Sequence, residues 1–252
     1  MSQIEITKKI KSFKKSIYVS GDKSLSIRWV LFASLADGVS KAQNLLMSED
    51  VFAAIKVLKK LGIKVNTKNN IFKIYGKGIN GFKYKKNIIL DAENSGTLGR
   101  LILGLLINTP YPIKLIGDKS LSKRDFKRIS DPLTKFGTTF KLHKNKSLPL
   151  TISGSKKLKP IYFEEKKGSA QCKSAVIFGG MRANGLTLIK AKKSRNHTEL
   201  LCKYLKLPLK VKKKKNYDLI EVKKVKKIKP LNYKIPSDIS SSAFFIVLTA
   251  LS

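Results

Sequence analysis

The chain has 252 residues, of which 42% are hydrophobic and 27% are charged, a balance typical of a globular protein rather than a disordered one. Lys and Arg number 53 against 16 Asp and Glu, so the formal net charge is +37, and nucleic acid or an anionic membrane must be considered as a partner. Only six of these basic residues are Arg, whereas nucleic-acid binders rely on its forked contacts to phosphate and guanine. We therefore expect a solvated lysine surface and no specific nucleic-acid partner.

The scarce cysteines and histidines exclude further classes. Cys172 and Cys202 have no metal-ligand spacing, and His143 and His197 lie far apart in the chain, so we expect no metal, no cofactor and no disulfide scaffold. The first sixteen residues contain no apolar signal core, and the longest apolar run is too short to span a bilayer. These features predict a cytoplasmic protein without a membrane partner.

Four stretches begin with small or hydroxyl residues and continue into an apolar block. In the first three, a basic residue recurs at Arg28, Arg100 and Lys173, which predicts a repeat of about 72 residues. An all-apolar helix must be enclosed by other elements, so we expect these helices at the centre of the fold. The stretches are KSLSIRWVLFASL (23–35), NSGTLGRLILGLL (94–106), GSAQCKSAVIFGG (168–180) and SSSAFFIVLTALS (240–252).

Amphipathic helices and strand-like runs alternate with these blocks. The helices are expected within EDVFAAIKVLKKLGIKV (49–65), KRDFKRISDPLTKFGTTF (123–140) and NHTELLCKYLKLPLKV (196–211), because apolar residues recur there at helical spacing before a Gly or Pro. Strands are expected at NIFKIYG (70–76), PIKLIGD (112–118), LPLTISG (148–154) and LTLIKA (186–191).

The repeat predicts an α/β fold, a threefold repeat of strand-helix units around buried apolar helices. We expect a complete three-repeat domain over residues 21–233. Residues 1–20 and 234–252 do not fit inside it, and we interpret them as parts of a second domain. On this interpretation the chain is truncated at its C-terminus, and the remainder lies beyond residue 252.

Six motifs in order resemble the 5-enolpyruvylshikimate-3-phosphate synthase family, the 3-phosphoshikimate 1-carboxyvinyltransferases, in the style of its second bacterial class. The resemblance covers essentially the whole chain and implies the N-terminal portion of a two-domain enolpyruvyl transferase, each domain with three α/β units and the active site in the cleft between them. The motifs are GDKSLSIR (21–28), ENSGTLGR (93–100), GDKSLSKRDF (117–126), GSAQCKSA (168–175), SRNHTE (194–199) and PSDISSSAFF (236–245).

The resemblance implies transfer of the enolpyruvyl group of phosphoenolpyruvate to shikimate 3-phosphate with release of phosphate, in the shikimate pathway to chorismate and the aromatic amino acids. Both substrates are polyanions, so a site with preorganised cations and N–H groups is needed. By resemblance, Lys23 contacts both substrates and is the one catalytic residue retained here. The shikimate 3-phosphate site would comprise Lys23, Ser24, Arg28, Ser169, Ala170, Gln171 and Arg195. The phosphoenolpyruvate site would comprise Lys23, Gly96, Arg124 and Gln171, supported by Asn94, Thr97 and Arg100.

The other catalytic residues of the family belong to the segment beyond residue 252, so we expect residues 1–252 alone to be inactive and the full-length protein to be a monomer. Gly96 is also expected to leave room for glyphosate in the full-length enzyme. One departure concerns Glu93, which stands where the family usually has glycine and would place a carboxylate near anion sites.

Local sequence allows structural alternatives for several of these residues. Ser24 is suited to cap the helix, with Lys23 and Arg28 merely solvated. Asn94 is suited to cap the second apolar helix. The alternative for Arg124 is a surface position that opens an amphipathic helix, where its charge is unfavourable at the positive end of the dipole, and this mismatch favours the functional interpretation.

Three other functions remain as alternatives. A related transferase acting on UDP-N-acetylglucosamine shares the fold, but it normally has Lys-Asn where Lys23-Ser24 stands and a reactive cysteine near residue 115, where this chain has YPIKL (111–115). A basic nucleic-acid-binding module is the alternative from a different class. The third is a non-catalytic half that assembles with a separately encoded second half.

Overall fold

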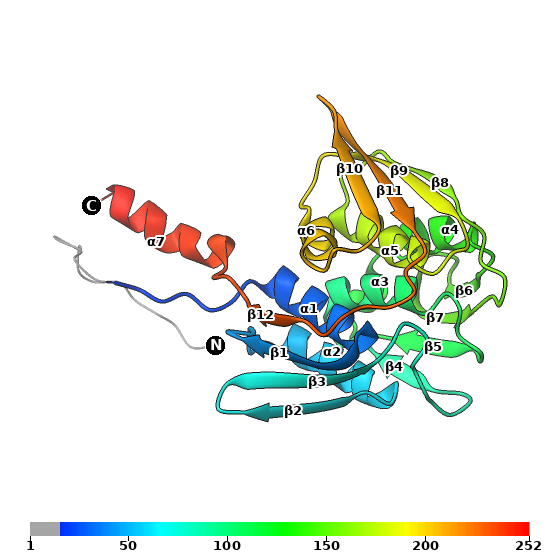
Figure 1. Ribbon diagram of the computed structural model, residues 1–252, viewed down its shortest axis with the longest axis horizontal. Helices are drawn as coiled ribbons and strands as arrows, with labels where there is room; N and C mark the ends of the chain where they lie inside the picture. Colours follow the sequence, from blue (N-terminus) through cyan, green and yellow to red (C-terminus); the bar gives the residue numbers. More distant parts are fainter. Residues whose placement is uncertain (1–15, 252) are drawn as a thin grey trace.

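The computed structural model describes residues 16–251, and it arranges them as three units of strands and helices (Figure 1). In the second and third units, the first strand runs parallel to the next strand, and two antiparallel strands complete a four-stranded sheet. The second sheet has the order β4-β5-β7-β6 and the third has the order β8-β9-β11-β10. The strands are β4 (Ile89–Asp91), β5 (Ile113–Ile116), β6 (Thr139–His143), β7 (Ser147–Ser153), β8 (Tyr162–Glu165), β9 (Leu186–Lys192), β10 (Leu209–Lys213) and β11 (Tyr217–Lys223).

The first sheet is completed by a strand from the far end of the chain. It contains β1 (Asp37–Gln43), β2 (Lys64–Lys68), β3 (Ile71–Lys77) and β12 (Asn232–Lys234), in the order β12-β1-β3-β2. β12 runs parallel to β1 and so takes the place that β4 and β8 have in the other two sheets. The third unit therefore closes the first, and the predicted threefold α/β fold is confirmed.

Three apolar helices lie between the sheets: α1 (Lys23–Leu35), α3 (Gly96–Leu105) and α5 (Ala170–Gly180). They are buried along nearly their whole length, as predicted. The rings of Phe32 and Phe178 have centroids 4.9 Å apart and join α1 to α5. A Cβ on Gly104 would lie 2.2 Å from the carbonyl oxygen of Ala175, so the contact between α3 and α5 requires glycine. Each buried Leu or Phe side chain contributes about 1.5–3 kcal/mol.

Three amphipathic helices pack outside this centre: α2 (Glu49–Lys60), α4 (Lys127–Thr134) and α6 (His197–Tyr204). All three lie within the predicted ranges. α2 and α6 pack on α1, and α4 packs on α5. α2 ends before Gly62, which has a φ of 84° that suits glycine.

The last described helix, α7 (Ile239–Leu251), projects away from the three units (Figure 1). The predicted helix is present, but none of its residues is buried. Within residues 16–251, no helix combines the length and the apolar character that a membrane crossing requires. The expected division at residue 233 stays a proposal, and most of the expected flank 1–20 lies outside the described residues.

Candidate functional site

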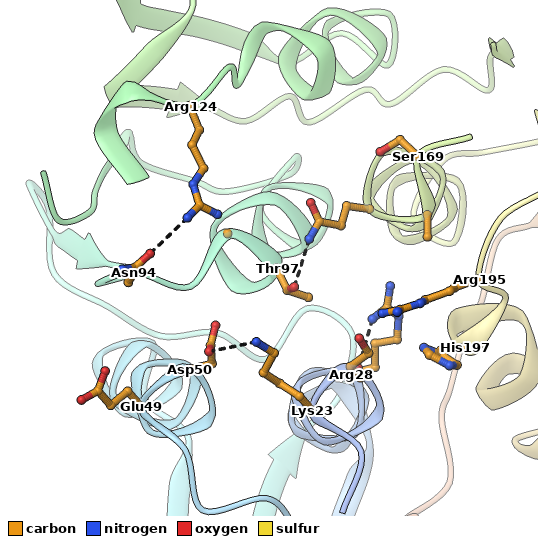
Figure 2. A pocket seen from close by; sticks show the side chains of 14 residues that line it. Lys23, Arg28, Glu49, Asp50, Asn94, Thr97, Arg124, Ser169, Arg195 and His197 are labelled. Carbon is orange, nitrogen blue, oxygen red and sulfur yellow. Dashed lines mark hydrogen bonds and ion pairs between the residues drawn. The ribbon is translucent and has the colours of Figure 1, made fainter. Parts of the chain in front are cut away.

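The N-terminal ends of the three central helices meet at one pocket with a volume of about 570 Å³ (Figure 2). Free N–H groups and the helix dipole make such ends favourable for anions. The described residues that line the pocket are Lys23, Ser24, Arg28, Glu49, Asp50, Asn94, Gly96, Thr97, Arg124, Ser169, Ala170, Gln171, Arg195 and His197.

Every residue that the motifs single out lines this pocket, with the exception of Arg100. Arg100 lies directly behind it: its Nη1 donates to Oε1 of Gln171 at 2.6 Å. Nε2 of Gln171 in turn donates to Oγ1 of Thr97 at 3.0 Å. The chain from Arg100 through Gln171 to Thr97 fixes the amide of Gln171 and joins α5 to α3. The role of Arg100 is thus to hold pocket residues in place.

Arg28 is only 2% exposed and is held on three sides. Its Nε donates to Oγ1 of Thr198 at 2.8 Å, its Nη2 to Oγ of Ser174 at 3.2 Å, and its Nη1 to the carbonyl oxygen of Ser24 at 3.0 Å. Burial lowers the pKa of Arg28 to about 10, so the guanidinium stays charged at neutral pH. The alternative of a merely solvated Arg28 is therefore wrong.

The residues that cap the N-termini of α1 and α3 are not those that local sequence suggested. Oδ1 of Asp22 accepts from the backbone N–H of Leu25 at 2.6 Å and caps α1, so Ser24 lies inside the first turn. Ser95 caps α3, and Asn94 precedes it. Asp and Ser are both strong N-cap residues, and each stands one or two positions from the expected cap. Ser24 and Asn94 are left available to the pocket.

Arg124 does not open a helix. It follows the short 3₁₀ helix η1 (Leu121–Lys123) in an extended conformation, and α4 begins only at Lys127. The reason is Asp125, whose Oδ1 accepts from the backbone N–H of Lys127 at 2.7 Å and favours a turn at that point. The alternative in which Arg124 opens the amphipathic helix is wrong, and its side chain extends into the pocket instead (Figure 2).

Gly96 leaves space for two guanidinium groups. A Cβ at this position would lie 3.0 Å from Nη1 of Arg124 and 3.2 Å from Nη1 of Arg100. Nη2 of Arg124 donates to Oδ1 of Asn94 at 3.3 Å, which orients the arginine across the start of α3 (Figure 2). Gly96 therefore lets the cationic groups approach the backbone.

Two acidic residues of the pocket were missed by sequence reasoning. Glu49 and Asp50 begin α2 and line the pocket opposite the arginines. Oδ2 of Asp50 lies 3.6 Å from Nζ of Lys23, so the carboxylate holds the ammonium toward the cavity. Acidic residues in a first turn are ordinary helix signals, and nothing in the linear sequence connects them with Lys23.

Glu93 does not bring a carboxylate into the pocket. Its Oε1 lies 2.7 Å from Nζ of Lys56 on α2, and the residue adopts a φ of 50°, which explains why glycine suits this position. The carboxylate is neutralised by a neighbour on the adjacent helix, so its repulsion of an anion is reduced.

His197 lies at the pocket edge beside Arg28 and Arg195 (Figure 2). Burial and the positive charge of Arg28 lower its pKa below the usual value. Within the described part of the chain, its buried Nδ1 has no hydrogen-bond partner. His197 is thus a neutral imidazole at neutral pH and was not among the predicted site residues.

The described residues contain no cluster of His, Cys, Asp and Glu that could hold a metal. Cys172 and Cys202 are free and buried, and burial raises the pKa of Cys172 to about 12. The thiolate is the reactive form of cysteine, so Cys172 is not suited to act as a nucleophile. The functional groups that line the pocket are cations, hydroxyls, amides, two carboxylates and the imidazole of His197.

The chain is similar to known proteins along nearly its full length. The family model described as EPSP synthase (3-phosphoshikimate 1-carboxyvinyltransferase) matches residues 7–252. A 3-phosphoshikimate 1-carboxyvinyltransferase of Caldicellulosiruptor bescii is 42% identical over 244 residues, which are 96% of this chain and 55% of that protein. The protein of the same name from Streptococcus agalactiae serotype III is 39% identical over 239 residues, covering 94% of this chain and 55% of that protein.

The structural comparison agrees. An EPSP synthase structure from Acinetobacter baumannii matches with a TM-score of 0.84 and 33% identity, over 92% of this chain and 52% of that one. This chain therefore spans about half the length of the curated relatives it matches, and it corresponds to their N-terminal half. Neither the UDP-N-acetylglucosamine transferase nor the nucleic-acid-binding module is favoured by these findings. The chain belongs to the EPSP synthase (3-phosphoshikimate 1-carboxyvinyltransferase) family.

Proposed function

We propose that this chain forms one wall of an active site that transfers the enolpyruvyl group of phosphoenolpyruvate to shikimate 3-phosphate. One observation carries the proposal: Lys23, Arg28, Arg124 and Arg195 converge with three helix N-termini on one pocket. Such a preorganised cationic arrangement suits two phosphate-bearing substrates. The relatives' printed names are consistent with this chemistry.

We assign shikimate 3-phosphate to the side of the pocket between α1 and α5. Arg28 and Arg195 lie close to one another there (Figure 2), and Ser169 caps the N-terminus of α5 on the same side. Two guanidinium groups at one place repel each other unless an anion lies between them. The phosphate of the acceptor substrate would supply that anion, while Ser24, Ala170 and Gln171 complete its contacts.

We assign phosphoenolpyruvate to the side near α3. Arg124 extends over Gly96, so its fork and the nearby backbone are free to bind a phosphate or a carboxylate. Asn94 holds Arg124 in this orientation, and Gln171 lies between the two substrate positions with Thr97 and Arg100 behind it. The two assigned subsites lie side by side in one pocket.

Lys23 is the residue we assign to catalysis and to both substrates. Its ammonium lies on the α1 side and is oriented by Asp50. Transfer forms a bond between the hydroxyl oxygen of the acceptor and the enolpyruvyl carbon and breaks the bond between that carbon and the phosphate oxygen, and in the overall balance the hydroxyl proton is carried by the released phosphate. An ammonium in this position can stabilise the charge on the departing phosphate and exchange a proton. The family's other proton-transfer groups are expected outside residues 1–252, so we expect this chain alone to bind but not to turn over.

Calorimetric titration of residues 1–252 with shikimate 3-phosphate tests the assigned site. We expect saturable binding that Arg195→Ala weakens about tenfold or more, because a hydrogen bond to a charged group contributes about 1.5–3 kcal/mol. Lys215→Ala removes the same charge from an exposed turn and serves as the matched control. Equal weakening in both variants would show that only the general positive charge attracts the ligand.

We further propose a cytoplasmic monomer at full length, without a specific nucleic-acid partner. The two free, buried cysteines fit a reducing compartment. The positive charge is carried mainly by dispersed lysines, which favours solvation over base recognition. Sedimentation of the full-length protein would test the oligomeric state.

A further inference from the structure

A second polar pocket lies at the opposite ends of the central helices. Its volume is about 320 Å³, and residues from all three units contribute to it. Asn108 follows α3, and Arg182 follows α5. The first pocket lies at the N-termini of these same helices, so the two pockets are separated by the 11 residues of α5, a length of about 16 Å.

Arg182 is the unusual residue of this second pocket. It is only 7% exposed, and burial lowers its pKa to about 10 with no opposing contribution from an acidic neighbour. Its Nη1 donates to the side-chain oxygens of Asn108 at 2.8 Å and Asn80 at 3.2 Å. Its Nη2 has no hydrogen-bond partner among the described residues. A buried cation without an anion is costly, so this guanidinium is suited to receive one.

The asparagines of the pocket present donors rather than acceptors. Oδ1 of Asn80 accepts from Arg182 and also from Nδ2 of Asn108 at 2.9 Å. Oδ1 of Asn184 accepts from Nζ of Lys224 at 2.6 Å. Lysine and arginine can only donate, so these bonds fix the amide oxygens toward the cations. Among residues 16–251, the side-chain amide N–H groups of Asn80 and Asn184 have no acceptor and remain for a ligand.

The charged side chains at the edge of this pocket also favour an anionic ligand. Lys156, Lys224 and Lys226 lie around Arg182, and none of the described lining residues is acidic. A site with several cations and N–H donors and no carboxylate favours an anion over a cation or a neutral ligand. The three lysines are exposed and can close over a ligand that reaches the buried guanidinium.

We propose that this second pocket binds a small multivalent oxyanion, a phosphate or a polycarboxylate, at the end of the fold remote from the transferase site. The ligand would pair with Arg182 at its inner end and with Lys224 and Lys226 at its rim. The site is separate from the first pocket, so its occupation does not depend on the proposed transferase function.

Nuclear magnetic resonance of residues 1–252 tests the proposal with inorganic phosphate in one titration and citrate in another. A Lys23→Ala/Arg124→Ala background weakens anion binding in the first pocket and so isolates the second. The signals to follow are the Nε–H of Arg182 and the side-chain amide of Asn108. We expect saturable shifts of both signals with at least one of the two anions, and the stronger binder identifies the class of ligand.

Two lysine variants provide the matched comparison in the same background. Lys224→Ala/Lys226→Ala should weaken the binding about tenfold or more, since two charge-assisted contacts are lost. Lys214→Ala/Lys215→Ala removes two exposed lysines from the turn between β10 and β11 and should leave the affinity unchanged.

Arg182→Gln should abolish the binding. If this variant does not fold, the proposal is tested by comparing the affinities of the two double lysine variants. Shifts that fail to saturate with both anions, or equal weakening in the two lysine variants, would overturn the proposal.

Discussion

The ion pair between Lys173 and Glu199 is the most deeply buried of those in residues 16–251. Nζ of Lys173 and Oε1 of Glu199 lie 2.6 Å apart, and their side chains are 0% and 6% exposed. The pair joins α5 to α6 directly behind Ser174 and Thr198, which hold Arg28. Removing one partner of a buried pair leaves an uncompensated charge and costs about 3–5 kcal/mol.

We therefore expect Glu199→Gln to lower the melting temperature strongly. A domain of this size loses roughly 2–4 °C per kcal/mol, so the expected decrease is about 6 °C or more. Circular dichroism of residues 1–252 during heating measures it. Asp131→Asn is the matched control, because Nζ of Lys127 lies at the same 2.6 Å from Oδ2 of Asp131 but both side chains are 55% exposed. An exposed helical pair contributes only about 0.3–0.5 kcal/mol.

A double variant distinguishes the effect of the buried charges on stability from the effect of side-chain packing. Oε2 of Glu199 has no hydrogen-bond partner among the described residues, and Nζ of Lys173 has none besides the ion pair. Lys173→Met/Glu199→Leu removes both charges and should recover most of the stability lost in Glu199→Gln, since apolar replacement of a buried pair is often neutral or stabilising. If Glu199→Gln melts no lower than Asp131→Asn, the reasoning about burial is refuted.

Three further predictions concern the first pocket. Thr198→Val should weaken shikimate 3-phosphate binding about fivefold or more in calorimetry, because Nε of Arg28 loses its acceptor and an unsatisfied buried group costs about 1–3 kcal/mol. In an enzyme of full length, Gly96→Ala should raise the KM for phosphoenolpyruvate and weaken inhibition by glyphosate, since the new Cβ would displace the guanidinium of Arg124. The free energy of unfolding should fall as the pH decreases below about 6.5, the unperturbed pKa of histidine. His197 has a lower pKa in the folded state than in the unfolded state, so the unfolded chain binds the proton first.

Each of these predictions has its own control. Thr198→Ser keeps the acceptor and should retain the affinity that Thr198→Val loses. Gly96→Ala should leave the affinity for shikimate 3-phosphate nearly unchanged, and an equal loss for both substrates would contradict separate subsites. Urea titrations at several pH values should show a smaller pH dependence for His197→Gln than for the unsubstituted chain.

The sequence was sufficient to predict the repeated core. The helices α1, α3 and α5 are apolar on all sides and recur at a constant spacing, and only enclosure stabilises such helices in water. The motifs at their N-termini also placed most of the pocket residues, because the start of a helix is a local feature with local signals.

Contacts between distant parts of the chain could not be predicted in the same way. β12 pairs with β1 across about 190 residues, and its three-residue strand carries no distinctive pattern. Asp50 contacts Lys23 only because α2 packs on α1. Arg182 and its asparagines come from three units, and no linear motif joins them. Lys173 likewise meets its ion-pair partner Glu199 only because α6 packs beside the central helices.

The most direct test of the proposed function is phosphate release in the presence of both substrates. It is measured for residues 1–252 and for a chain extended to the length of the relatives. We expect steady release from the extended chain, its loss in Lys23→Ala, and no release from residues 1–252. An extended chain that folds and binds shikimate 3-phosphate but releases no phosphate would contradict the transferase function. Release by residues 1–252 that Lys23→Ala abolishes would contradict the claim that this pocket is one wall of the active site.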